Sequence, residues 1–204
     1  MSILNVLLRP DQLLVAVDTL AEDAKTGALS SGAKMLLIPQ YNLVLAARGS
    51  TQFFLRMYEL ILQASYRADF ALEQVTAELG RVIDRLWIDY EQAAAQVGLP
   101  MEALHTELVL GGWSLKECRF AATAYAKSSR EGAALVQPLA GGLASPGEPL
   151  VGREDSFALE DVLAAGKLQA AWLNGRVGRQ VAGGHLLAAV LRPGQVVIHD
   201  LGQI

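Results

Sequence analysis

The sequence predicts an α+β fold in which two antiparallel sheets lie between layers of helix. Strand and helix signals come in blocks along the chain: strands, two helices, strands, one helix, strands. This block order is typical of antiparallel sheets covered by helices, whereas a parallel sheet shows regular alternation of strand and helix. The apolar period also changes, from every second residue near the N-terminus to every third or fourth after residue 50.

The first fifty residues predict four strands. Leu4, Val6 and Leu8 form one apolar face of the first strand, and the turn at Pro10 leads into a short apolar run that ends at Asp18. A loop of small residues then precedes a second pair of strands, which are joined by a turn at 39–41. The four strands are expected at 4–9, 13–18, 34–38 and 42–47.

Two consecutive helices follow, because apolar residues recur at three-to-four spacing. The first is expected over 50–65, with Ser50 or Thr51 as its N-cap. The second begins near Asp69 and ends at Gly98. The rest of the chain predicts strands at 106–110, 119–126 and 134–139, a Gly/Pro-rich loop at 141–152, a helix at 159–173, and strands at 185–191 and 195–198.

Composition excludes several classes of protein. A net charge of −4 and a pI of about 5.4 do not provide a basic surface for nucleic acid. No apolar run approaches the roughly 18–20 residues of a membrane helix, so the apolar content of 52% predicts a core plus an interface between subunits. Cys118 is the single cysteine, and the N-terminus lacks a signal-peptide pattern. We therefore expect a cytoplasmic protein.

Cofactor, metal and classical triad sites are not expected. Cys118 and the histidines lack the spacing of metal ligands. The segment from Gly175 to Gly178 follows a helix but precedes none, which is unlike a dinucleotide-binding loop. A Ser–His–Asp triad is disfavoured because Gly112-Trp113-Ser114 lacks the second glycine of a nucleophile elbow. His105, His185 and His199 are interpreted as strand or surface residues.

Three polar residues stand at the ends of the first strands with a characteristic spacing. Asp18 and Lys34 follow Ser2 by 16 and 32 residues. This spacing resembles that of proteasome β-subunits and the related bacterial ATP-dependent protease, which are N-terminal-nucleophile hydrolases. The local contexts resemble the family as well: 15–19, 32–35, 47–50, 108–113 and 182–184.

The resemblance implies the four-layer αββα fold of a proteasome subunit, formed by residues 1–204 as one domain. It also implies that Ser2 becomes a nucleophile once Met1 is removed, with its own α-amine, of pKa about 7.7–8.0, as the base. Lys34 would then favour the alkoxide, Asp18 would orient Lys34, and the N–H of Gly49 would bind the oxyanion of a peptide or amide substrate. Partners implied are further copies in a ring or stacked homo-oligomer, and an ATPase unfoldase.

The sequence departs from the family in its supporting residues. The proteolytic members mostly use threonine where this chain has Ser2. An aspartate and a serine usually precede the late glycine pair, but Arg179 and Ala182 stand there. Ser145 is a candidate for the missing serine. These departures leave open a second interpretation, a non-catalytic homologue that serves as an oligomeric scaffold or binding protein.

Overall fold

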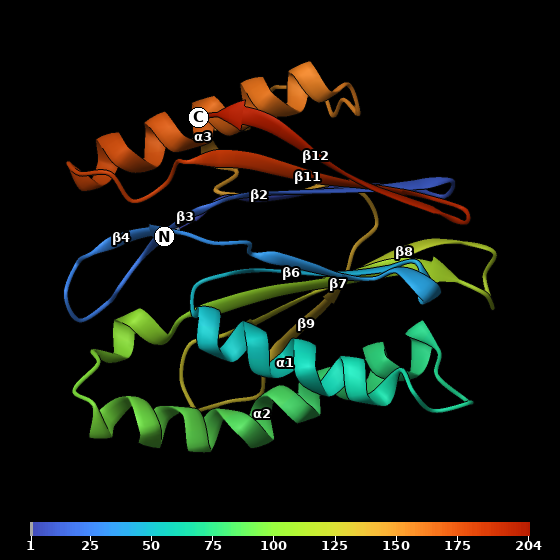
Figure 1. Ribbon diagram of the computed structural model, residues 1–204, viewed down its shortest axis with the longest axis horizontal. Helices are drawn as coiled ribbons and strands as arrows, with labels where there is room; N and C mark the ends of the chain where they lie inside the picture. Colours follow the sequence, from blue (N-terminus) through green and yellow to red (C-terminus); the bar gives the residue numbers. More distant parts are fainter. Residues whose placement is uncertain (1) are drawn as a thin grey trace.

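The computed structural model describes residues 2–204 and shows two five-stranded antiparallel sheets stacked face to face (Figure 1). Helices α1 (Thr51–Ala64) and α2 (Leu72–Gln96) cover the outer face of one sheet, and α3 (Leu159–Val177) covers the outer face of the other. The layers therefore run helix, sheet, sheet, helix, and the predicted α+β sandwich is confirmed. No helix among the described residues is long and apolar enough to cross a membrane.

The sheet beneath α3 contains both ends of the chain. Its strand order is β10-β1-β2-β11-β12, and every neighbouring pair is antiparallel. Its strands are β1 (Leu4–Arg9), β2 (Gln12–Asp18), β10 (Leu143–Ser145), β11 (His185–Arg192) and β12 (Gln195–Gln203).

The second sheet lies beneath α1 and α2, in the order β5-β6-β7-β8-β9. Its strands are β5 (Met35–Ile38), β6 (Leu43–Arg48), β7 (Thr106–Ser114), β8 (Arg119–Lys127) and β9 (Leu135–Pro138). A separate hairpin of β3 (Leu20–Glu22) and β4 (Leu29–Ser31) connects the two sheets in sequence. Short 3-10 turns lie at Pro39–Tyr41, Met101–Leu104 and Glu148–Leu150.

Strand β2 contributes to two apolar layers, one on each of its faces. Leu13, Val15 and Val17 point into the core between the sheets, while Leu14 and Ala16 point toward α3. All five side chains are fully buried. A strand covered on both faces reads as a continuous apolar run, which is why this segment lacks the polar alternation of a surface strand.

Helix α1 begins as the sequence predicts. The Ser50 side chain accepts a hydrogen bond from the Phe53 N–H at 3.2 Å, which satisfies one of the free donors of the first turn. Helix α2 begins at Leu72, later than predicted, because the chain first makes a turn in which the Phe70 N–H bonds the Arg67 carbonyl.

Short strands account for the main differences from the predicted elements. Strand β3 precedes the predicted small-residue loop 26–33, β4 lies within that loop, and β10 lies within the predicted loop 141–152. Strand β12 also continues to Gln203, beyond the predicted end at 198. A strand of three residues has too little sequence to show a period, and β10 exists because β1 lies beside it.

Candidate active site

The structure brings the side chains of Ser2, Asp18 and Lys34 together. The Lys34 Nζ donates to Ser2 Oγ at 2.6 Å and to Asp18 Oδ1 at 2.7 Å. It also donates to the Leu20 carbonyl oxygen. Lys34 therefore has three oxygen partners, and one of them is the hydroxyl that the sequence predicts to be the nucleophile.

Asp18 holds the surrounding backbone as well as Lys34. Its Oδ1 accepts a hydrogen bond from the Ile3 N–H at 2.9 Å, and its Oδ2 accepts one from the Gly183 N–H at 3.2 Å. The side chain is fully buried, so its charge is balanced by these donors rather than by water. Asp18 thus positions the residue next to Ser2 and the late glycine pair at once.

Strand register explains why these three residues meet. Leu4 pairs with Val17 in the β1–β2 ladder, so the segment before β1 lies beside the end of β2. Lys34 comes from the other sheet, just before β5, where its carbonyl accepts the Ala47 N–H. The site therefore joins the two sheets at one end of the sandwich.

Burial lowers the pKa of Lys34 below its usual value. The charge and hydrogen bond of Asp18 oppose this shift, and the nearby charge of Arg48 adds to it. Loss of water disfavours the ammonium form, while a carboxylate at 2.7 Å favours it. Lys34 consequently releases its proton at lower pH than an exposed lysine does.

An open cavity of about 540 Å³ gives access to Ser2, and Lys34 and Gly49 also line it. Gly49 has φ +102°, and a Cβ there would collide with the His105 carbonyl oxygen. Only glycine fits this turn between β6 and α1. Other lining residues come from the β3–β4 hairpin, the end of β6, the start of α1, α2, the segment between α2 and β7, and the segment after α3: 20–25, 48, 50–52, 90, 99, 103–105 and 179.

A second polar network adjoins this cavity, and two of its members, Arg48 and His105, line it. Arg48 donates to Ser145 Oγ, Ser145 donates to Glu107 Oε2 at 2.9 Å, and His105 lies 2.9 Å from Glu107 Oε1. Burial raises the pKa of Glu107, but the His105 hydrogen bond, the Arg48 charge and the Ser145 hydroxyl outweigh it and hold the pKa below its usual value. The hydrogen bonds of Ser145 go to Arg48 and Glu107 rather than to Ser2.

The late glycine loop is organised by a residue that sequence reasoning missed. Asn174 Oδ1, near the end of α3, accepts the N–H groups of Val181 and Ala182 at 2.8 and 3.0 Å. Its Nδ2 donates to the Ala182 carbonyl at 3.0 Å. Ala182 is fully buried, and Arg179 forms an ion pair with Glu22 at 2.8 Å. A lone asparagine in a helix carries no motif, so nothing in the sequence singled it out.

Comparison with known proteins identifies the fold. No family model matches the chain, and no curated protein matches it in sequence. Among solved structures it resembles Anbu, an ancestral β-subunit from Yersinia bercovieri, with a TM-score of 0.65 over 100% of this chain and 86% of that one. The chain has a proteasome-like fold. At 13% sequence identity the likeness shows the fold and leaves activity to be argued from the site.

Proposed function

We propose that the protein is an N-terminal serine amidohydrolase, peptidase-like in its substrate, with Ser2 as nucleophile. The observation that carries this proposal is the position of Lys34, whose Nζ lies 2.6 Å from Ser2 Oγ and 2.7 Å from Asp18 Oδ1. A serine hydroxyl is a weak nucleophile until a base takes its proton, and a nearby positive charge favours the alkoxide. The cavity leaves Ser2 open to a peptide segment.

The proposed reaction begins with attack of Ser2 Oγ on the carbonyl carbon of a peptide or amide. The proton passes to the α-amine of Ser2, and the Lys34 ammonium stabilises the developing alkoxide. The Gly49 N–H would bind the tetrahedral oxyanion, a contribution of about 10²–10³ in rate for such a donor. The amine of the substrate leaves with the proton, and water hydrolyses the resulting ester on Ser2.

The mechanism requires a free α-amine on Ser2. Met1, whose removal would free it, lies outside the described residues. With Met1 attached, the Ser2 nitrogen is an amide and accepts no proton. Intact-mass measurement of protein purified under native expression is expected to show the loss of Met1. A mass that includes Met1 would contradict a mechanism in which the α-amine of Ser2 acts as the base.

The assignment of the nucleophile is tested by substitution. Ser2→Ala is expected to abolish hydrolysis of a fluorogenic peptide panel, whereas Ser2→Thr retains a hydroxyl and is expected to keep measurable activity. Ser31→Ala is a matched control, because Ser31 is exposed in β4. Unchanged hydrolysis by Ser2→Ala would rule Ser2 out as the nucleophile.

A non-catalytic scaffold is the alternative, and Arg179 and Ala182 motivate it. The Arg179 side chain is paired with Glu22, and Ala182 has no polar side chain to offer the N-terminus. A scaffold predicts that Ser2 does not react with a β-lactone electrophile. Mass spectrometry of the digested protein would detect the ester on Ser2, and its presence would exclude the scaffold.

We also propose that the chain forms a homo-oligomer, in keeping with its fold. The outer helix layer exposes apolar side chains such as Leu55 and Ile88, which are about half exposed. Light scattering coupled to gel filtration would measure the mass, and Leu55→Glu with Ile88→Glu is expected to dissociate an assembly that uses this layer. Delivery of substrates by an ATPase unfoldase remains part of the proposal.

A further inference from the structure

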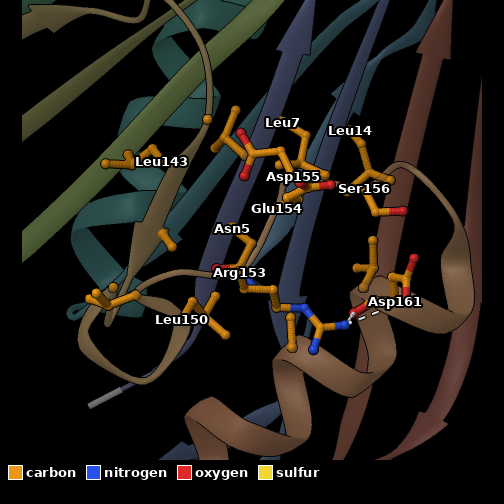
Figure 2. A pocket seen from close by; sticks show the side chains of 17 residues that line it. Asn5, Leu7, Leu14, Leu143, Leu150, Arg153, Glu154, Asp155, Ser156 and Asp161 are labelled. Atoms are coloured by element: carbon orange, nitrogen blue, oxygen red, sulfur yellow. Dashed lines mark hydrogen bonds and ion pairs between the residues drawn. The ribbon is translucent and has the colours of Figure 1, made fainter.

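A second cavity, of about 230 Å³, lies on the α3 side of the sandwich (Figure 2). The segment 142–156 covers it, and β1, β2 and the first half of α3 form its walls. It shares no lining residue with the Ser2 cavity. The candidate active site therefore does not account for this second cavity.

The cavity has an apolar floor of defined size. Leu7, Leu14, Leu143, Leu150 and Val162 line it. An engineered apolar cavity of about 150 Å³ is large enough to bind benzene. A volume of about 230 Å³ thus suits a small molecule somewhat larger than benzene.

Two paired amides, Asn5 and Gln169, lie beside this cavity, and Asn5 is one of its lining residues. Gln169 is fully buried, and its Nε2 donates to the Pro146 carbonyl at 2.7 Å, which fixes the orientation of that amide because a carbonyl only accepts. Gln169 Nε2 also donates to Asn5 Oδ1 at 2.8 Å, and Asn5 Nδ2 donates back to Gln169 Oε1 at 2.6 Å.

The side-chain amide of Asn5 has a second donor hydrogen. Its Nδ2 carries two hydrogens, and within residues 2–204 only the one toward Gln169 has a partner. Asn5 is 7% exposed and is one of the residues that line the cavity. A ligand oxygen there would satisfy this second N–H.

Two carboxylates that are exposed to solvent also line the cavity. Glu154 and Asp155 line it, and neither forms an ion pair within the described part of the chain. Arg153 also lines it, but its guanidinium is directed to Asp161, at 3.5 Å from Oδ1. Figure 2 shows Glu154 and Asp155 above Asn5 and Arg153 in that view.

We propose that this cavity binds a free α-amino acid with an aliphatic side chain, such as leucine. The ligand ammonium would meet the carboxylates of Glu154 and Asp155, and its carboxylate would accept the second N–H of Asn5. The side chain of the ligand would lie on the apolar floor. A zwitterion with an aliphatic tail matches all three features, whereas a purely cationic or purely apolar ligand leaves one of them unused.

Titration calorimetry on the full chain with three related probes tests the proposal. L-Leucine is expected to bind at least about tenfold more tightly than leucinamide, which lacks the carboxylate, or 4-methylpentanoate, which lacks the ammonium. Equal binding of all three would mean a non-specific apolar cavity and would overturn the proposal. So would leucinamide binding as tightly as leucine, which is the pattern expected of a peptide N-terminus.

Substitutions locate the site. Asp155→Asn is expected to weaken leucine binding about tenfold and to leave 4-methylpentanoate unchanged, while the matched control Asp11→Asn, in an exposed turn, changes neither. Gly142→Ala is also expected to weaken leucine binding, because a Cβ there would lie 2.7 Å from Asp155 Oδ2 and displace that carboxylate. Thermal unfolding of each variant confirms that it is folded.

Ser2→Ala separates this proposal from the proposed hydrolase activity. The variant is expected to bind leucine as the unsubstituted protein does, because the two cavities share no residue. Loss of leucine binding in Ser2→Ala would place the ligand in the Ser2 cavity and overturn the proposal, whatever the enzyme assay shows. No binding of leucine by the folded, unsubstituted protein would also overturn it.

Discussion

At the scale of single residues, Lys34 connects the other two side chains of the candidate active site, Ser2 and Asp18. It lies between a hydroxyl and a carboxylate, each within 2.7 Å of its Nζ, and it is 8% exposed. A buried ion pair adds little net stability, because desolvation offsets much of the attraction, but removing one partner leaves a buried charge. Lys34 and Asp18 therefore depend on each other.

Lys34→Met is expected to lower the free energy of unfolding by about 3–5 kcal/mol, since it leaves the Asp18 carboxylate without its counter-charge. The double variant with Asp18→Asn is expected to recover part of this loss. Urea unfolding followed by circular dichroism measures both. If the two single losses simply add in the double variant, the coupling between Lys34 and Asp18 is absent.

Glu107 makes stability depend on pH in the acid range. Its pKa in the folded protein lies below the usual 4.5, so the folded state favours the carboxylate. The stability that it contributes is present above about pH 4.5 and is lost as pH falls through the folded-state pKa. The unfolding free energy of Glu107→Gln is therefore expected to approach that of the unsubstituted protein as pH is lowered from 6 to about 3.5. A difference that is constant with pH would contradict this expectation.

At the scale of elements, the turn between β6 and α1 sets the geometry of the Ser2 cavity. Gly49 occupies a φ of +102°, and its backbone passes close to His105 and Thr106 at the start of β7. The turn ends β6, starts α1 at the Ser50 cap, and brings Gly49 to the cavity wall. A side chain at this glycine would strain the backbone and also collide with the neighbouring segment.

Gly49→Ala and Gly98→Ala separate the two effects. Gly98 also has positive φ, but a Cβ there meets nothing within 4 Å. Gly98→Ala is expected to cost about 1–2 kcal/mol from backbone strain alone. Gly49→Ala is expected to cost about 1–3 kcal/mol more, because the His105 carbonyl must move. Equal losses in thermal unfolding would show that the close approach is unimportant.

At the scale of the whole molecule, one side-chain contact ties the first strand to the last helix. Asn5 in β1 and Gln169 in α3 are 164 residues apart and exchange two hydrogen bonds, of 2.6 and 2.8 Å. The pair holds the N-terminal strand against the α3 layer, and Pro146 adds the segment after β10. The hydrogen bonds of such a buried network rigidify the segments that they join.

Asn5→Leu is expected to destabilise the protein by about 1–3 kcal/mol, because Gln169 keeps a buried amide with fewer partners. Adding Gln169→Leu to Asn5→Leu is expected to cost less stability than Gln169→Leu costs alone. In the double variant both side-chain amides are gone, and only the Pro146 carbonyl loses its partner. A double-mutant cycle from denaturant unfolding measures the coupling, and a coupling energy of zero would refute the cooperative pair.

Local pattern by itself determined the main elements. Apolar alternation in β1 and the three-to-four spacing of α1 are properties of short segments, and the structure confirms both. The spacing of Ser2, Asp18 and Lys34 also predicted that their side chains lie together, and the structure shows these contacts. Their catalytic role stays a proposal. That residues 1–204 form one domain likewise stays a prediction.

Only the tertiary structure decided the features that depend on distant partners. Strand β10 is three residues long and forms because β1 lies beside it, and Ser145 at its end bonds Arg48 and Glu107 rather than Ser2. Asn174 and the Asn5–Gln169 pair carry no sequence signal either. The physical reason is the same in each case: period and capping act within one segment, whereas these contacts arise only when separate segments are packed together.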